Sequence, residues 1–187
     1  MTIPLTKNFV SLLTKYKTME KASKTTNLCN SFPPAIGLLP RILILGSMPG
    51  VESLRQQKYY AFKHNVFWKI MGELCHFSPE LPYPERLKAL TSHKVALWDT
   101  LQYCERAGSL DTAIAKPEPN AIKDLLQNNP CIEKICCNGT ASHRYLHRFF
   151  PHIAIPVVQL PSTSPAAARM RYPEKLECWR AEIQPFL

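Results

Sequence analysis

The stretch from Arg41 to Ile70 places the strongest constraint on how this chain can fold. It begins with the apolar run ILIL at 42–45, which is typical of a strand buried on both faces of a parallel sheet. The run ends in the sequence GSMPG at 46–50, where two glycines and a proline predict a turn whose backbone can approach a ligand closely. We therefore expect an open α/β sheet with a ligand site at the carboxyl end of this strand.

A loop rich in aromatic and basic residues follows the turn, and a helix is predicted directly after Asn65, with Phe67, Ile70, Met71 and Leu74 on one buried face. The carboxamide of Asn65 offers donors and an acceptor, so it could orient a water molecule or bind the edge of a base. Asparagine is also a common helix N-cap. Catalysis and capping are both open on residue type alone, and one carbonyl oxygen could serve both.

Strand-like and helix-like segments alternate along the rest of the chain. Further strands are predicted at 95–98, 132–137 and 155–160, and helices at 85–92, 120–128 and 174–184, with another helix after Asn138-Gly139-Thr140. Pro156 indicates a sheet edge or a strand start, and the residues from Asp99 to Gly108 are expected to form a polar loop. The alternation predicts a three-layer α/β/α sandwich with a central parallel sheet.

A length of 187 residues fits one domain, and a net charge of +9 with a pI near 9.3 indicates a polyanionic partner. Nucleic acid is the commonest such partner, and an anionic membrane surface is the alternative. No apolar run approaches the ~20 residues that a membrane span needs. The N-terminus lacks the features of a signal peptide. We therefore expect a cytoplasmic protein that does not enter a membrane.

Residues 1–30 differ in composition from the remainder, because lysine, serine, threonine and asparagine dominate them. They could form a basic arm that contacts phosphates. They could instead be a loosely packed extension, or the start of translation could be assigned too far upstream, with Met19 as the true start. The second interpretation is favoured because termini are usually loose. We expect a basic extension over 1–30 and one domain over 31–187.

The seven cysteines are odd in number and include no C-x-x-C pair. Zinc and iron–sulfur sites usually need closely spaced ligands, so no metal is expected. Cys136 and Cys137 lie in an apolar strand, where they are expected to behave as small buried hydrophobes. No cofactor is expected either.

Four motifs, in this order and spacing, resemble the uracil-DNA glycosylase superfamily, and within it the hypoxanthine-DNA glycosylase branch. They are Gly46-Ser47-Met48-Pro49-Gly50, the pair Tyr59-Tyr60-Ala61 and Asn65-Val66-Phe67-Trp68-Lys69-Ile70, Ala96-Leu97-Trp98-Asp99, and 160–166 (LPSTSPA). The resemblance runs from about Phe32 to the C-terminus. It implies a sheet of four central parallel strands and a monofunctional enzyme, and we expect a monomer. Such an enzyme hydrolyses the N-glycosidic bond of deaminated bases, chiefly hypoxanthine, in double-stranded DNA during base excision repair.

The resemblance also implies roles for individual residues. Asn65 falls at the catalytic position, and Tyr60 at the aromatic that stacks on the flipped base. The turn residues Gly46, Ser47 and Met48 would line the base pocket. Asp99, at a strand end, is expected to hold a loop by accepting backbone N–H bonds or to cap the following turn.

Two departures from the superfamily pattern bear on substrate choice. Met48 stands where the mismatch-specific uracil glycosylases carry a water-orienting asparagine, and a serine-threonine-serine loop stands where the strongest uracil glycosylases carry a histidine. Both predict hypoxanthine excision well above uracil excision. The alternatives are a uracil- or mismatch-specific glycosylase, a non-catalytic DNA-binding protein of the same fold, and a small α/β protein that cradles phosphate.

The remaining predicted contacts are with the DNA backbone and the base stack. The loop residues Ser162, Thr163 and Ser164 are expected to grip phosphates through hydroxyl and amide groups. Beyond them, Met170 could wedge into the gap left by the flipped base, with Arg169 and Arg171 on phosphates. These last three assignments rest on position in the sequence alone.

Overall fold

The computed structural model describes residues 27–187 of the chain. Its main sheet has four parallel strands in the order β3-β2-β6-β7, namely β3 (Val95–Asp99), β2 (Ile42–Gly46), β6 (Lys134–Asn138) and β7 (Val157–Leu160). The predicted central four-stranded parallel sheet is confirmed. All four strands end at the same edge, so the residues that follow them gather there.

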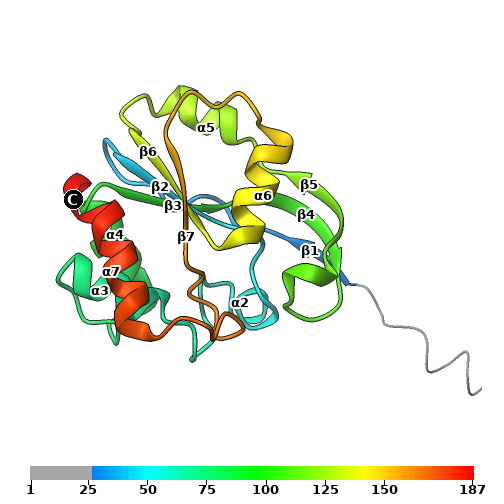
Figure 1. Ribbon diagram of the computed structural model, residues 1–187, viewed down its shortest axis with the longest axis horizontal. Helices are drawn as coiled ribbons and strands as arrows, with labels where there is room; N and C mark the ends of the chain where they lie inside the picture. The colour runs from blue at the N-terminus through cyan, green and yellow to red at the C-terminus, as the bar shows by residue number, and fades with distance from the viewer. Residues whose placement is uncertain (1–26) are drawn as a thin grey trace, which may run out of the picture.

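Helices cover both faces of this sheet, as the α/β/α prediction requires (Figure 1). Figure 1 shows α5 and α6 on one side and α3, α4 and α7 on the other. Their bounds are α3 (Phe67–Leu74), α4 (Tyr83–Ser92), α5 (Ile122–Asn128), α6 (Thr140–Phe149) and α7 (Tyr172–Ile183), with a short α2 (Val51–Gln56) after the first strand of the sheet. A final turn, η2 (Gln184–Phe186), follows α7.

The core forms around β2 because this strand has a neighbour on each side and a helical layer on each face. Residues 42–45 of β2 have no exposed surface, and Phe67, Ile70 and Met71 of α3 are equally buried. Burying such side chains contributes about 1.5–3 kcal/mol each. The apolar run that dominates the sequence therefore becomes the centre of the molecule.

The predicted element bounds are shifted by one or two residues at several ends. The last strand begins after Pro156 rather than at residue 155, and β7 is the outer strand of the sheet, so both interpretations of Pro156 hold. The helix α4 begins at Tyr83 because Pro84 fits its first turn.

A second, antiparallel sheet corrects the expectation of a polar loop after Asp99. It has the order β1-β4-β5, with β1 (Asn27–Asn30), β4 (Leu101–Arg106) and β5 (Ala115–Pro119). The sequence of β4, LQYCER, contains too few apolar residues to predict a strand. Leu101 and Cys104 are buried and pack with Met48 and Tyr145 in a second small cluster instead of in the main core.

The first strand also bears on the predicted extension over 1–30. Residues 27–30 pair with β4 and so belong to the folded domain. Residues 1–26 lie outside the described residues. Within 27–187, no helix has the length and apolar character needed to cross a membrane.

Candidate active site

A cavity of about 310 Å³ opens at the carboxyl ends of β2, β3 and β6. Its volume is within the range of small-ligand pockets, roughly 300–1,000 Å³. Its walls come from the turn 46–53, the loop 59–65, the segment 109–111 and the loop 162–166, with Asp99 and Asn138 at the strand ends. The cavity therefore lies at the sheet edge where the sequence pattern places the ligand site.

Asn65 enters the cavity from the start of α3. Its Oδ1 accepts a hydrogen bond from the backbone N–H of Phe67 at 3.0 Å, so the side chain does bond the first turn of the helix. Since the carbonyl oxygen is fixed to the helix, the amide nitrogen Nδ2 is the free end of the side chain. Within residues 27–187 this nitrogen has no hydrogen-bond partner, and Asn65 lines the cavity. The hydrogen bond to Phe67 therefore orients the Asn65 amide nitrogen and does not compete with its role as a donor.

Tyr60 presents an aromatic ring to the same cavity. One ring face stacks on Phe67, with centroids 3.9 Å apart and planes at 22°. Burial raises the pKa of the Tyr60 hydroxyl well above its usual range. A planar ligand in the cavity would meet a ring that the hydrophobic core supports from behind.

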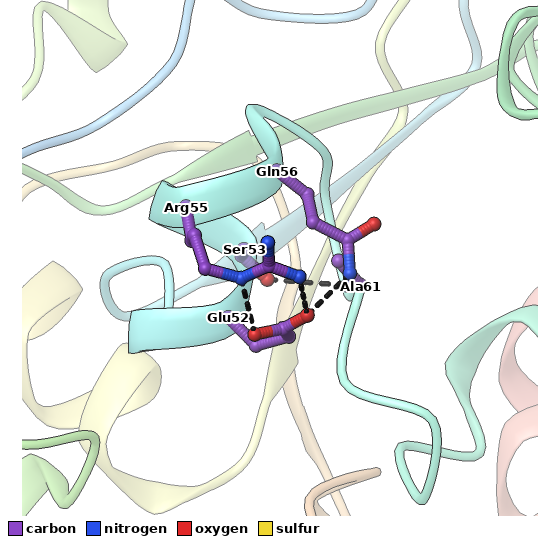
Figure 2. A network of polar contacts seen from close by, with 5 residues as sticks. All are labelled: Glu52, Ser53, Arg55, Gln56 and Ala61. Atoms are coloured by element: carbon purple, nitrogen blue, oxygen red, sulfur yellow. Dashed lines mark hydrogen bonds and ion pairs between the residues drawn. The ribbon is translucent and has the colours of Figure 1, made fainter.

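The backbone of Tyr60 is held in a left-handed conformation, with φ at 52°, which an aromatic residue rarely adopts. Ser53 of α2 stabilises this turn, because its Oγ accepts a hydrogen bond from the N–H of Ala61 at 3.2 Å (Figure 2). Beside it, Glu52 accepts hydrogen bonds from Arg55 and Gln56, which lower the pKa of Glu52 to about 2. The short helix α2 therefore anchors the loop that carries Tyr60.

Asp99 lies at the cavity floor, 4% exposed. Its Oδ2 accepts a hydrogen bond from Ser31 at 3.2 Å. A side chain at Gly46 would place its Cβ 2.3 Å from Asp99 Oδ1 and 3.2 Å from the hydroxyl of Tyr60. A glycine is therefore needed at position 46 because the Asp99 carboxyl group leaves no room for a Cβ atom. The sequence analysis attributed this glycine to close approach of a ligand.

Burial raises the pKa of Asp99 to about 7, and the hydrogen bond from Ser31 opposes this shift only in part. The structure shows no backbone N–H group within residues 27–187 that donates to the Asp99 carboxyl, so the expected loop-holding role is wrong in that form. The free Oδ1 faces the cavity region around Gly46. Asp99 consequently belongs to the candidate site and does not serve a structural role alone.

The loop 162–166 forms the wall next to Asn65. Thr163 is 1% exposed, and its carbonyl accepts a hydrogen bond from the N–H of Val66 at 3.1 Å. Lys175 of α7 lies beneath the loop and donates to the carbonyls of Ser162 at 2.8 Å and Ala167 at 2.9 Å. Buried Thr163 therefore orders the loop, while Ser162 and Ser164 are more exposed members of it.

The three residues predicted further along this segment lie outside the cavity. Arg169, Met170 and Arg171 contribute nothing to its walls. The guanidinium of Arg171 pairs with Glu174 at 2.8 Å in the first turn of α7. Their contact with DNA stays a prediction.

Three features of the site escaped the sequence analysis. Asn138 ends β6 and lines the cavity, and its place after a buried strand was the available signal. Arg106, 1% exposed, donates to the carbonyl of Pro49 and so fixes the turn after β2. The segment 109–111 also forms a cavity wall, and no local pattern predicts this because the antiparallel sheet brings the segment there.

All seven cysteines are free thiols. Among residues 27–187, no three histidine, cysteine, aspartate or glutamate side chains converge in a way that could hold a metal ion. The cavity offers instead the amides of Asn65 and Asn138, several carboxyl groups that include Asp99, hydroxyls and aromatic rings. These groups suit a planar polar ligand such as a nucleobase.

Comparison with known proteins agrees with this arrangement. The family model "Uracil DNA glycosylase superfamily" matches residues 33–182. Two proteins named hypoxanthine DNA glycosylase, from Methanosarcina barkeri and Methanosarcina acetivorans, are 36% and 35% identical over 115 residues, which span 61% of this chain and 73% of each relative. The solution NMR structure of a candidate uracil DNA glycosylase from M. acetivorans superposes with a TM-score of 0.74 at 31% identity, covering 86% of this chain and 99% of that one.

A parallel sheet with a cavity of about 310 Å³ at its carboxyl edge defines an open α/β protein whose ligand site lies at its strand ends. Within that class, the chain belongs to the uracil DNA glycosylase superfamily.

Proposed function

We propose that this protein is a monofunctional DNA glycosylase that removes hypoxanthine from deoxyinosine in double-stranded DNA. The observation that carries the proposal is the Asn65 amide, whose oxygen is bonded to the N–H of Phe67 and whose nitrogen is free at the cavity beside Tyr60. The two Methanosarcina relatives named hypoxanthine DNA glycosylase support the same lesion.

The substrate base would leave the helical stack and enter the cavity, where the ring of Tyr60, supported by Phe67, would stack on it. Water attacks C1′ of the sugar, the bond between C1′ and N9 breaks, and the proton that the water loses is balanced by the one that the departing base takes up. Positive charge on the sugar is stabilised by the neighbouring DNA phosphates. A neutral amide can therefore assist the reaction where a carboxylate would otherwise be needed.

Two groups of the pocket suit the edge of hypoxanthine. The Asn65 amide nitrogen is a donor for the oxygen at C6, and the free oxygen of Asp99 in its ionised form is an acceptor for the N–H at position 1. Adenine presents the opposite pattern, with a donor at C6 and an acceptor at position 1. Each unpaired buried group costs about 1–3 kcal/mol, so two mismatches disfavour adenine by roughly a hundredfold or more.

Uracil shares the polar pattern of hypoxanthine, so the pocket edge alone does not reject it. The difference is in the chemical step. Met48, 6% exposed in the turn after β2, cannot orient a water molecule through a polar side chain. A uracil leaving group depends more on such assistance, because a purine can also be protonated or hydrogen-bonded at N7. We therefore expect inosine excision to exceed uracil excision.

The test uses the purified full chain in single-turnover reactions with duplexes that carry one inosine, uracil or xanthine, followed by alkaline cleavage at the abasic site. The expected result is fastest release from the inosine duplex and none from a matched adenine duplex. Faster release from a uracil–guanine duplex would place the protein on the uracil-specific side of the superfamily. Absence of alkali-labile product from every duplex would contradict the glycosylase proposal itself.

A further inference from the structure

Two histidines lie one turn apart on α6, outside the cavity wall. His143 is half-buried and His147 is exposed. Side chains at positions i and i+4 of a helix lie above one another on the same face. The two Nε2 atoms are 3.1 Å apart, and the ring centroids are 4.4 Å apart with the ring planes at 61°. The two imidazoles therefore direct one nitrogen each toward a common point.

The helix that carries this pair is fixed to the central sheet. Ser142, which has no exposed surface, donates to the carbonyl of Leu45 at 2.7 Å, and its hydroxyl lies 3.0 Å from Thr100 Oγ1. Tyr145 and Leu146 are buried on the inner face of the same helix. The backbone under the two histidines is therefore ordered already, and a ligand bound between the rings would not have to order it.

The separation of the two nitrogens matches that of imidazoles bound to one transition metal ion. Imidazole nitrogens coordinate zinc at about 2.0–2.1 Å. Two such bonds place the nitrogens about 2.9 Å apart at a right angle and about 3.3 Å apart at the tetrahedral angle. The observed separation of 3.1 Å lies between these two values. A metal ion would therefore fit the pair with small rotations of the rings and no movement of the helix.

Coordination needs the lone pair of both Nε2 atoms, so both rings must be neutral. Without a metal ion, one ring carries its proton on Nε2 and donates it to the other ring. When that proton moves to Nδ1 of the same ring, the second lone pair is freed and both rings stay neutral. Partial burial, followed by the neighbouring His147, lowers the pKa of His143 and so favours the neutral form.

The groups around the pair decide how many ligands the protein supplies. Within residues 27–187, no third histidine, cysteine, aspartate or glutamate joins the two rings, so water would complete the coordination of a bound ion. The guanidinium of Arg144 lies 5.0 Å from the ring centroid of Tyr145, and that of Arg148 lies 5.2 Å from the ring centroid of Phe149. These two positive charges lower the affinity of the helix for a cation. The expected affinity is therefore that of two imidazoles and no more.

We propose that His143 and His147 form a binding site for a divalent transition metal ion of the kind that imidazole ligands favour, namely nickel, copper or zinc. The ion would join two adjacent turns of α6 and so stabilise the second half of this helix. The site is separate from the cavity, and the proposal does not depend on the proposed glycosylase function.

The experiment is a calorimetric titration of the full chain with nickel(II) at neutral pH, in the absence of DNA. The wild type should bind one nickel ion per chain. His143→Gln and His147→Gln should each lower the affinity by roughly a hundredfold, because each removes one of two linked ligands. His152→Gln and Cys131→Ser are the matched controls, since they remove an exposed imidazole and an exposed thiol outside the pair. Both controls should bind nickel as the wild type does.

Urea unfolding at a fixed nickel concentration gives a second measurement. Nickel should raise the unfolding midpoint of the wild type and of both controls, and it should leave the midpoints of the two pair variants unchanged. A wild type that does not bind nickel one to one would overturn the proposal. Unchanged affinity in both pair variants, or an equal loss in either control, would place the ion elsewhere and overturn it as well.

Discussion

Asn138 and Thr163, which both line the cavity, are joined by two hydrogen bonds. The amide nitrogen of Asn138 donates to Thr163 Oγ1 at 2.9 Å, and the N–H of Thr163 donates to Asn138 Oδ1 at 2.9 Å. The Thr163 carbonyl then accepts a hydrogen bond from Val66, the residue after Asn65. The end of β6, the loop 162–166 and the start of α3 therefore form one connected network.

Asn138→Ala should weaken this network and the activity together. It removes both bonds and leaves the N–H of buried Thr163 unpaired, which costs about 1–3 kcal/mol in the free energy of unfolding. Base release should also slow, because the loop is no longer tied to the segment that carries Asn65. Urea unfolding and single-turnover assays measure the two effects. Asn138→Asp keeps the acceptor and should lose less stability; a smaller loss in the alanine variant would contradict the arrangement.

Asn65→Asp should separate the contribution of Asn65 to helix stability from its contribution to base release. Aspartate retains an oxygen for the N–H of Phe67, so the unfolding midpoint should stay near that of the wild type. It lacks the amide donor, so the single-turnover rate on inosine duplexes should fall by roughly 10²–10³-fold, as when one transition-state donor is removed. Asn65→Ala should lose both the cap and the rate. Wild-type rates in the aspartate variant would show that the amide nitrogen takes no part.

Asp99→Asn should change how stability depends on pH. The pKa of Asp99 is raised by burial to about 7 in the folded protein, against an ordinary value of 3.8. Between these values the folded state retains a proton that the unfolded state releases, so stability falls as pH rises from about 4 to about 7. Each unit of difference corresponds to about 1.4 kcal/mol.

The measurement is urea unfolding of the wild type and the asparagine variant across that pH range. The variant should show a flatter profile, since asparagine does not titrate. Its base release from inosine should be slower above pH 7, where the wild-type carboxylate is the expected acceptor for the base N–H. Parallel stability profiles would show that Asp99 is not protonated in the folded protein.

Lys175→Met should loosen the loop 162–166 from below. It removes the two bonds from Nζ to the carbonyls of Ser162 and Ala167 while preserving most of the apolar stem. We expect weaker binding to inosine duplexes and a stability loss of about 1–3 kcal/mol, since two carbonyls lose a charged donor. Fluorescence-anisotropy titration and urea unfolding measure these effects. Lys123→Met, on the exposed surface of α5, controls for the loss of one positive charge. Equal weakening of DNA binding in both variants would show that the effect comes from net charge and not from the loop.

The central sheet could be predicted from the amino-acid sequence, because the signals for its strands are local. An apolar run such as ILIL at 42–45 has few alternatives to a buried strand, and alternating helices leave parallel pairing as the solution. The place of Asn65 at a helix start could be predicted for the same reason: a carboxamide before an amphipathic helix is a local pattern. The location of the cavity, at the carboxyl ends of the parallel strands, follows from strand direction.

The rest of the site could not be predicted from local patterns, because it depends on contacts between segments that are distant in the sequence. The strand β4 carries polar residues and gains its identity from pairing with β1 and β5, which brings Leu110 to the cavity rim. The raised pKa of Asp99 comes from burial by its surroundings, which no pattern around residue 99 encodes. Asn138 meets Thr163 for the same reason: parallel strands end at one edge, and side chains 25 residues apart in the sequence then share hydrogen bonds.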